Sequence, residues 1–134
     1  MNMTERTITP ETLQSDLAQF TGSEHYYRHG LNRNFMHTDG VNYLAEKAGA
    51  YWLIDLIASH QLSRKVRAEP FQLWTLTLTG KKNPMAVAEC RADTDAPVLA
   101  RQEIEFTDFP LKSIKLYCVD GGGGRKILML PSEY

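Results

Sequence analysis

The sequence predicts an α+β fold in which two N-terminal helices pack on one face of a roughly five-stranded antiparallel meander sheet. Apolar residues recur at helical spacing in the first half of the chain and alternate with polar residues from Phe71 onward. Short turns separate the alternating runs, and consecutive strands joined by short turns favour a meander. A length of 134 residues is enough for one buried core, so residues 1–134 are expected to form a single domain.

The longest helical pattern covers residues 38–61, and the core is expected to form around this central helix. Thr38 or Asp39 can cap it by accepting hydrogen bonds from the first free backbone N–H groups. One continuous apolar face is formed by Val41, Leu44, Ala45, Ala48, Trp52 and Leu56. Further apolar residues lie on other faces of its second half, which is therefore expected to be covered on nearly all sides.

A shorter amphipathic helix is expected between Thr9, as its cap, and Gly22, which ends it. Pro10 suits the first turn because its φ is already fixed near the helical value. The apolar residues at helical spacing are Leu13, Leu17 and Phe20. A helix this short needs a partner surface, and residues 1–8 before it are expected to form a frayed tail.

Five strands are expected after the helices. They cover residues 71–79, 85–91, 99–107, 113–119 and 125–130. In the third strand Arg101, Glu103 and Glu105 share one side, which is expected to face water. Residues 121–124 are all glycine and are expected to form a hairpin tip, because the strand pattern that follows does not fit a phosphate-binding loop.

Composition narrows the classes of partner. The formal net charge of −1 gives no general attraction to nucleic acid, so a nucleic-acid partner is not expected. No apolar run is long enough to span a membrane, the N-terminus lacks a secretory signal, and a cytoplasmic location is expected. Cys90 and Cys118 are then expected to be reduced and buried as small apolar residues, with a redox or disulfide pair as the alternative.

Residues 23–37 connect the two predicted helices and hold the candidate binding site. This connection contains three of the four histidines. It is expected to lie outside the core as a polar and aromatic surface. The candidate binding residues are Tyr26, Tyr27, Arg28, His29, Arg33 and Asp55. Because such residue types are common at binding surfaces and no complete catalytic set is present, we expect a non-enzymatic binding protein. Its partner is expected to be an unidentified protein, and the chain to be a monomer or homodimer without a cofactor.

A small metal-dependent hydrolase is the alternative. If residues 23–29 are helical, His25 and His29 lie one turn apart and can present two imidazoles to one metal ion, with His37 or Asp39 as a third ligand. Neither a metal-binding HExxH motif nor a cysteine pair accompanies them, so no residue is assigned as catalytic or as a metal ligand. A third interpretation is an apolar pocket under the sheet that sequesters a small ligand.

Asp55 interrupts an apolar run in the part of the central helix that is expected to be covered. A buried carboxylate needs a partner, or its pKa rises until it is neutral. Ser59, a basic residue between 64 and 67, or a tyrosine hydroxyl can reach it. A structural tether, or a narrow polar stripe at the edge of the helix, is the favoured interpretation, and an acid of a functional site is the alternative.

The chain also resembles a known family. The residues that carry the resemblance are 16–29 (DLAQFTGSEHYYRH), 38–60 (TDGVNYLAEKAGAYWLIDLIASH), 70–74 (PFQLW), 101–111 (RQEIEFTDFPL) and 130–134 (LPSEY). They resemble a family of small bacterial proteins, also carried by phages and plasmids, that form a domain of unknown function. The resemblance covers nearly the whole chain except the first few residues and residues 121–124. It implies a cytoplasmic setting and admits a role in conflict between hosts and mobile elements, and it brings no catalytic residue, cofactor or partner.

Overall fold

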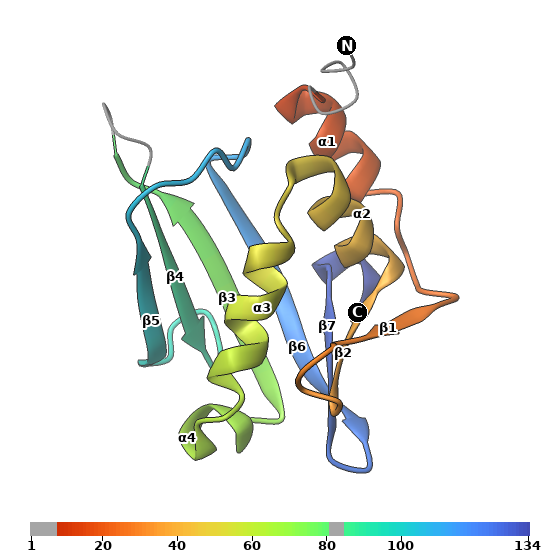
Figure 1. The fold of residues 1–134 in the computed structure, drawn as a ribbon, viewed down its shortest axis with the longest axis vertical. Helices are drawn as coiled ribbons and strands as arrows, with labels where there is room; N and C mark the ends of the chain where they lie inside the picture. The colour runs from red at the N-terminus through yellow and green to blue at the C-terminus, as the bar shows by residue number, and fades with distance from the viewer. Residues whose placement is uncertain (1–7, 81–84) are drawn as a thin grey trace.

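The computed structural model describes residues 8–80 and 85–134, and within them the chain has an α+β fold (Figure 1). A mixed seven-stranded sheet forms one layer, and the helices α2 (Asp39–Ala48) and α3 (Tyr51–His60) lie across one of its faces. Of the expected N-terminal tail, only Ile8 falls within the described residues. None of the helices in the described part of the chain is both long and apolar enough to cross a membrane.

The described residues form four α-helices rather than the expected two. α1 (Pro10–Leu17) begins as expected, because the side chain of Thr9 accepts a hydrogen bond from the N–H of Thr12 at 3.1 Å, but it ends before Gly22. α4 (Arg64–Arg67) lies between α3 and the third strand, and a short 3₁₀ turn, η2 (Pro131–Glu133), follows the last strand. The helices are therefore interspersed with the strands and are not confined to the N-terminus.

The prediction of one continuous central helix is wrong. Gly49 adopts the left-handed conformation at φ 62°, and the N–H of Ala50 bonds to the carbonyl of Ala45 at 2.8 Å, which closes α2. The helix restarts as α3, and its buried face is formed by other residues than the expected continuous face. Leu53 and Ile57 are buried there, whereas Trp52 is only half-buried.

All five expected strands are present. They are β3 (Phe71–Leu78), β4 (Ala86–Arg91), β5 (Val98–Ile104), β6 (Ser113–Gly122) and β7 (Arg125–Met129). As expected, Arg101 and Glu103 are exposed on β5, and glycines with positive φ at 122, 123 and 124 close the hairpin between β6 and β7. Residues 81–84 of the expected turn before β4 lie outside the described part.

The meander topology is wrong. The described strands follow the order β1-β2-β7-β6-β3-β4-β5, so β6 returns to pair with β3 and leaves β5 at one edge. The return is made by residues 105–112, which cross the end of the sheet and bury Phe109 and Leu111 in the core (Figure 1). A buried apolar crossing of this kind replaces the short turn that the prediction assumed between the third and fourth strands.

Two further strands come from the connection between the two predicted helices, where no strand was expected. β1 (Tyr26–Arg28) and β2 (Phe35–Thr38) form an antiparallel hairpin, and β2 lies parallel to β7 with Met36 opposite Ile127. These strands are short, and β2 buries two polar residues, so their alternation is too weak to be read from the sequence.

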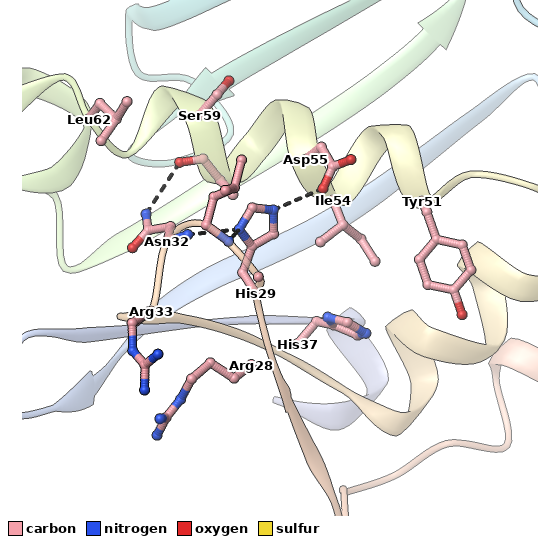
Figure 2. Close-up of a pocket in the computed structure, with 13 residues that line it drawn as sticks. Arg28, His29, Asn32, Arg33, His37, Tyr51, Ile54, Asp55, Ser59 and Leu62 are labelled. Atoms are coloured by element: carbon pink, nitrogen blue, oxygen red, sulfur yellow. Dashed lines mark hydrogen bonds and ion pairs between the residues drawn. The ribbon is translucent and has the colours of Figure 1, made fainter.

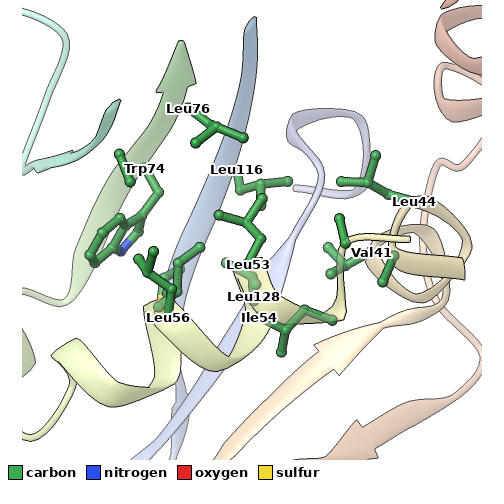
Figure 3. Close-up of a cluster of buried hydrophobic side chains, with 14 of the residues drawn as sticks. Val41, Leu44, Leu53, Ile54, Leu56, Trp74, Leu76, Leu116 and Leu128 are labelled. Carbon is green, nitrogen blue, oxygen red and sulfur yellow. The ribbon is translucent and has the colours of Figure 1, made fainter. Parts of the chain in front are cut away.

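The core lies between α2, α3 and the central strands (Figure 3). Leu116 of β6 and Leu128 of β7 are buried beneath the helices, and burial of one such side chain stabilises the fold by about 1.5–3 kcal/mol. Cys90 and Cys118 are free and fully buried, as expected. Burial raises the pKa of both thiols to about 12, so they are protonated at neutral pH.

Candidate functional site

A pocket of about 960 Å³ opens between α3 and the β1–β2 hairpin (Figure 2). Residues 28–33 and His37 form one wall, and residues of α3 together with Leu62 form the other. Ligand sites of proteins are usually concave, largely apolar and of a few hundred to a thousand cubic ångströms, with a small number of placed polar groups. This pocket, at the upper end of that range, is the candidate functional site.

Two polar contacts join the two walls, one between His29 and Asp55 and one in which Nδ2 of Asn32 donates to the carbonyl of Ala58 at 3.4 Å. The Nε2 atom of His29 lies 2.8 Å from Oδ1 of Asp55. The Nδ1 atom accepts hydrogen bonds from the backbone N–H groups of Leu31 and Asn32 at 3.2 and 2.9 Å. Because Nδ1 is the acceptor, Nε2 carries the proton and donates a hydrogen bond to Asp55. The imidazole thus connects the hairpin to α3.

Asp55 is not in the covered position that the sequence suggested. Its side chain is 71% exposed, because it lies on the outer face of α3 together with Tyr51 and Ser59, which are also exposed and lie one turn away on either side. It does have a partner, as a tether requires, but that partner is His29 rather than Ser59, a tyrosine or the basic residues 64–67.

Both nitrogens of His29 are occupied by protein groups. A general base must offer a free lone pair within hydrogen-bond reach of the proton that it removes. The Nδ1 lone pair of His29 faces two backbone N–H groups instead, and Nε2 is the donor to Asp55. In this arrangement His29 holds the pocket together and is not placed to take a proton from a bound molecule.

His37 lines the pocket, and its Nδ1 atom accepts no hydrogen bond from the described residues. Its ring is 7% exposed, and its Nε2 atom lies 3.0 Å from Oδ1 of Asn42, which also accepts from the Tyr51 hydroxyl at 3.3 Å. Nε2 is then the donor, and Nδ1 is a buried acceptor without a hydrogen-bond partner among the described residues. Burial lowers the pKa of His37, so the ring is neutral at pH 7.

His25 and Asp39 belong to a separate cluster at the start of β1. Oδ2 of Asp39 accepts from the backbone N–H groups of Glu24 and His25 at 3.0 and 3.2 Å, and Oδ1 lies 3.5 Å from Nδ1 of His25. Partial burial raises the pKa of Asp39, but these donors and the Tyr27 hydroxyl outweigh it and hold that pKa below its ordinary value. The hydrogen bond to Asp39 in turn raises the pKa of Tyr27.

The four residues of the predicted metal site do not come together. The helical spacing assumed for His25 and His29 is absent, because this segment leads into and out of a strand. His29 and His37 line the pocket, whereas His25 and Asp39 do not. Across residues 8–80 and 85–134, no three side chains of the His, Cys, Asp and Glu types are arranged so that they could hold a metal ion.

The predicted binding residues divide between the pocket and its edge. Arg28, His29, Arg33 and Asp55 line the pocket. Tyr26 and Tyr27 lie on β1 outside it, where the Tyr27 ring stacks on that of His37 with centroids 5.1 Å apart. Arg28 and Arg33 extend in the same direction, away from α3, and neither forms an ion pair within the described part of the chain (Figure 2).

The sequence interpretation missed the apolar rim. Leu31 is 93% exposed and Leu62 is 76% exposed, and both line the pocket with the partly exposed ring of Tyr51. A leucine beside Gly30 and Asn32 in a polar loop was the available signal, because an apolar side chain in such a loop has no core to enter.

Residues 11–134 match the model of a family of unknown function, DUF6876. The match confirms the resemblance to a family of unknown function over nearly the whole chain. No curated protein and no solved structure matches the chain.

Proposed function

This chain belongs to the DUF6876 family, whose function is unknown, and from the geometry of its pocket we propose that it is a non-enzymatic binding protein. Its binding site is the pocket between α3 and the β1–β2 hairpin, and the occupant is part of a protein partner. A cytoplasmic setting and a role in conflict between hosts and mobile elements belong to the same proposal, and the resemblance supports both.

The observation that carries this proposal is the exposed apolar rim beside unpaired positive charge. Leu31 and Leu62 are largely exposed and line the pocket, as do Arg28 and Arg33, whose guanidinium groups extend away from α3. Contiguous apolar surface with arginine and aromatic side chains around it is the usual composition of the centre of a protein interface.

The same geometry makes the hydrolase the weaker candidate. The alternative hydrolase relies on a metal ion held by His25, His29, His37 and Asp39. The described part of the chain groups no three metal-ligating side chains, and both nitrogens of His29 are held by protein groups.

Site-specific photo-crosslinking tests the binding proposal. Leu62 is replaced by the photoreactive amino acid p-benzoylphenylalanine, and the purified protein is irradiated in an extract of its source organism. Phe106, replaced in the same way, is the matched control, because it is 71% exposed and follows β5 at the opposite edge of the sheet.

We expect discrete protein adducts from position 62 and none from position 106. Leu31→Asp should reduce the adducts from position 62, because it places a charge in the apolar rim beside the two arginines. Equal adducts from both positions, or none from either, would contradict the proposal.

A further inference from the structure

The strand at the edge of the sheet next to the pocket, β1, is paired on one side only within the described part of the chain. β1 is the last strand in the sheet order, and β2 is its one neighbour among the described strands. Tyr27 lies opposite His37, and the N–H of His29 bonds to the carbonyl of Phe35 at 2.8 Å. In an antiparallel pair every second residue directs its N–H and C=O toward the partner strand. In β1 and directly after it, these residues are Tyr27 and His29.

The backbone groups of Tyr26 and Arg28 therefore point away from β2. Together they offer two N–H donors and two C=O acceptors on an exposed edge. An extended chain that lies along this edge can pair with these four groups, which is the geometry of recognition by strand addition.

The pocket begins where this edge ends. Arg28 is both the last residue of β1 and a lining residue of the pocket, and Leu31 and Leu62 stand at the mouth. Since β1 has only three residues, main-chain pairing alone gives little affinity. A partner strand must therefore gain most of its affinity from a side chain in the pocket.

Charge indicates which kind of chain fits. Arg28 and Arg33 lack ion-pair partners within residues 8–80 and 85–134, whereas the carboxylate in the pocket, Asp55, is bound to His29. Two guanidinium groups without ion-pair partners, in a pocket whose one carboxylate is already hydrogen-bonded, favour an anionic ligand. A guanidinium group can bind a carboxylate through two parallel hydrogen bonds.

The opposite edge of the sheet is built differently. On β5, Arg101 forms ion pairs with Glu103 at 2.9 Å and with Glu89 of β4 at 3.3 Å. Charged side chains along an edge strand discourage pairing with another chain, and here their charges are already satisfied. The pocket, the apolar rim and the unpaired arginines are all on the β1 side.

We propose that the partner binds as an extended acidic peptide segment that adds a strand to the free edge of β1 and places one apolar side chain in the pocket. This inference rests on the proposed function and specifies the chemistry of the partner. The strand contributes main-chain hydrogen bonds to Tyr26 and Arg28, its acidic residues contact Arg28 and Arg33, and its apolar side chain lies between Leu31 and Leu62.

The probe is a displayed library of random linear twelve-residue peptides, selected against the full chain. We expect the enriched peptides to combine acidic residues with one large apolar residue. A synthetic copy of an enriched peptide is then N-methylated at one backbone position at a time, and each form is titrated against the protein by calorimetry. Because only Tyr26 and Arg28 present backbone groups on the free edge, binding should weaken at the two peptide positions opposite them and be kept at the position between these two.

Charge reversal supplies the matched pair of variants. Arg33→Glu should weaken binding of the acidic peptide at least about tenfold, as loss of a central charged contact does. Lys115→Glu makes the same change of charge on an exposed residue of β6 that does not line the pocket, and it should leave the affinity unchanged.

The outcomes separate the two proposals. No enriched peptide, enrichment of basic peptides, or N-methylation effects without alternation would overturn strand addition by an acidic segment. If adducts from position 62 nevertheless persist, the pocket is still a binding site and only the mode of binding is wrong. If those adducts are absent as well, both the mode of binding and the proposed function are wrong.

Discussion

The ring of His37 is enclosed on its faces and partnered on one nitrogen only. Tyr27 stacks on it from β1, Asn42 accepts from Nε2, and Nδ1 has no partner in the described part of the chain. A buried acceptor of this kind costs free energy unless something donates to it. Protonation of the ring would place a positive charge in this buried position, which costs free energy. The stability of the fold is therefore expected to depend on pH.

Replacement of His37 by Gln should flatten the dependence of stability on pH. Burial lowers the pKa of His37 below its ordinary value of 6.5, so below about pH 6.5 the unfolded chain binds the proton more readily than the folded chain. The free energy of unfolding must therefore fall as the pH drops from 6.5 toward the lower pKa of the folded state. Urea denaturation between pH 5 and pH 7.5 should show a shallower decline in His37→Gln than in the parent.

His25→Gln is the control for this measurement. Its imidazole is exposed at the start of β1 and lies outside the pocket, so its loss should leave the His37-dependent decline in place. Equal flattening in both variants would show that burial of His37 is not the cause.

At the scale of single elements, Gly49 decides how the helical half of the chain is divided. It ends α2 in the left-handed conformation, which an L-residue with a Cβ adopts at a cost. The direction of α3 across the sheet, and with it the exposed position of Asp55 opposite His29, follows from this break. One glycine thus places a wall of the pocket.

Gly49→Ala should lower the free energy of unfolding by about 1–2 kcal/mol, the cost of a left-handed conformation with a Cβ. Thermal or urea denaturation measures it. Gly22→Ala is the matched control, because a Cβ there meets nothing within 4 Å and should change stability little. An unchanged stability in Gly49→Ala would indicate that the helix break does not depend on this conformation.

Local signals predicted the elements better than their arrangement. Thr9 caps α1 as expected, α2 is capped by Thr38, the alternative to Asp39, and every alternating run from Phe71 onward is a strand. The break at Gly49 was missed because the apolar spacing continues across it and a glycine inside a helical pattern is often tolerated. Strand β2 was missed because it is held by pairing with β7, which is distant in the sequence, and β1 was missed because it is held by pairing with β2 rather than by its own residue pattern.

The candidate site shows the same limit. The sequence singled out Arg28, His29, Arg33 and Asp55, and the fold brings all four to one pocket. Their relation could not be predicted, since the contact between His29 and Asp55 spans 26 residues and depends on the direction of α3. Histidine spacing also suggested a metal site through a helical turn that the chain does not form.

At the scale of the whole molecule, the sheet order predicts a gradient of local stability. β7, β6 and β3 are flanked by strands on both sides and covered by the helices, whereas β1 and β5 are edges. Backbone amides in paired, covered strands open only in large unfolding events, and those on exposed edges exchange readily.

Hydrogen exchange followed by NMR should resolve this gradient residue by residue. The amides of Leu116 and Leu128 should be among the slowest, and those of Tyr26 and Arg28 among the fastest. The amide of Tyr27 is the internal control, because it faces β2 and should exchange more slowly than its two neighbours. Equal protection of all three amides would contradict the register that leaves Tyr26 and Arg28 unpaired.

β7 lies between β2 on one side and β6 on the other, and it is the one described strand that joins the hairpin to the rest of the sheet. The hairpin carries one wall of the pocket, while α3, which packs over the central strands, carries the other. A substitution within the five residues of β7 is therefore expected to alter the relative position of the two walls, and with it the proposed binding, although β7 does not line the pocket.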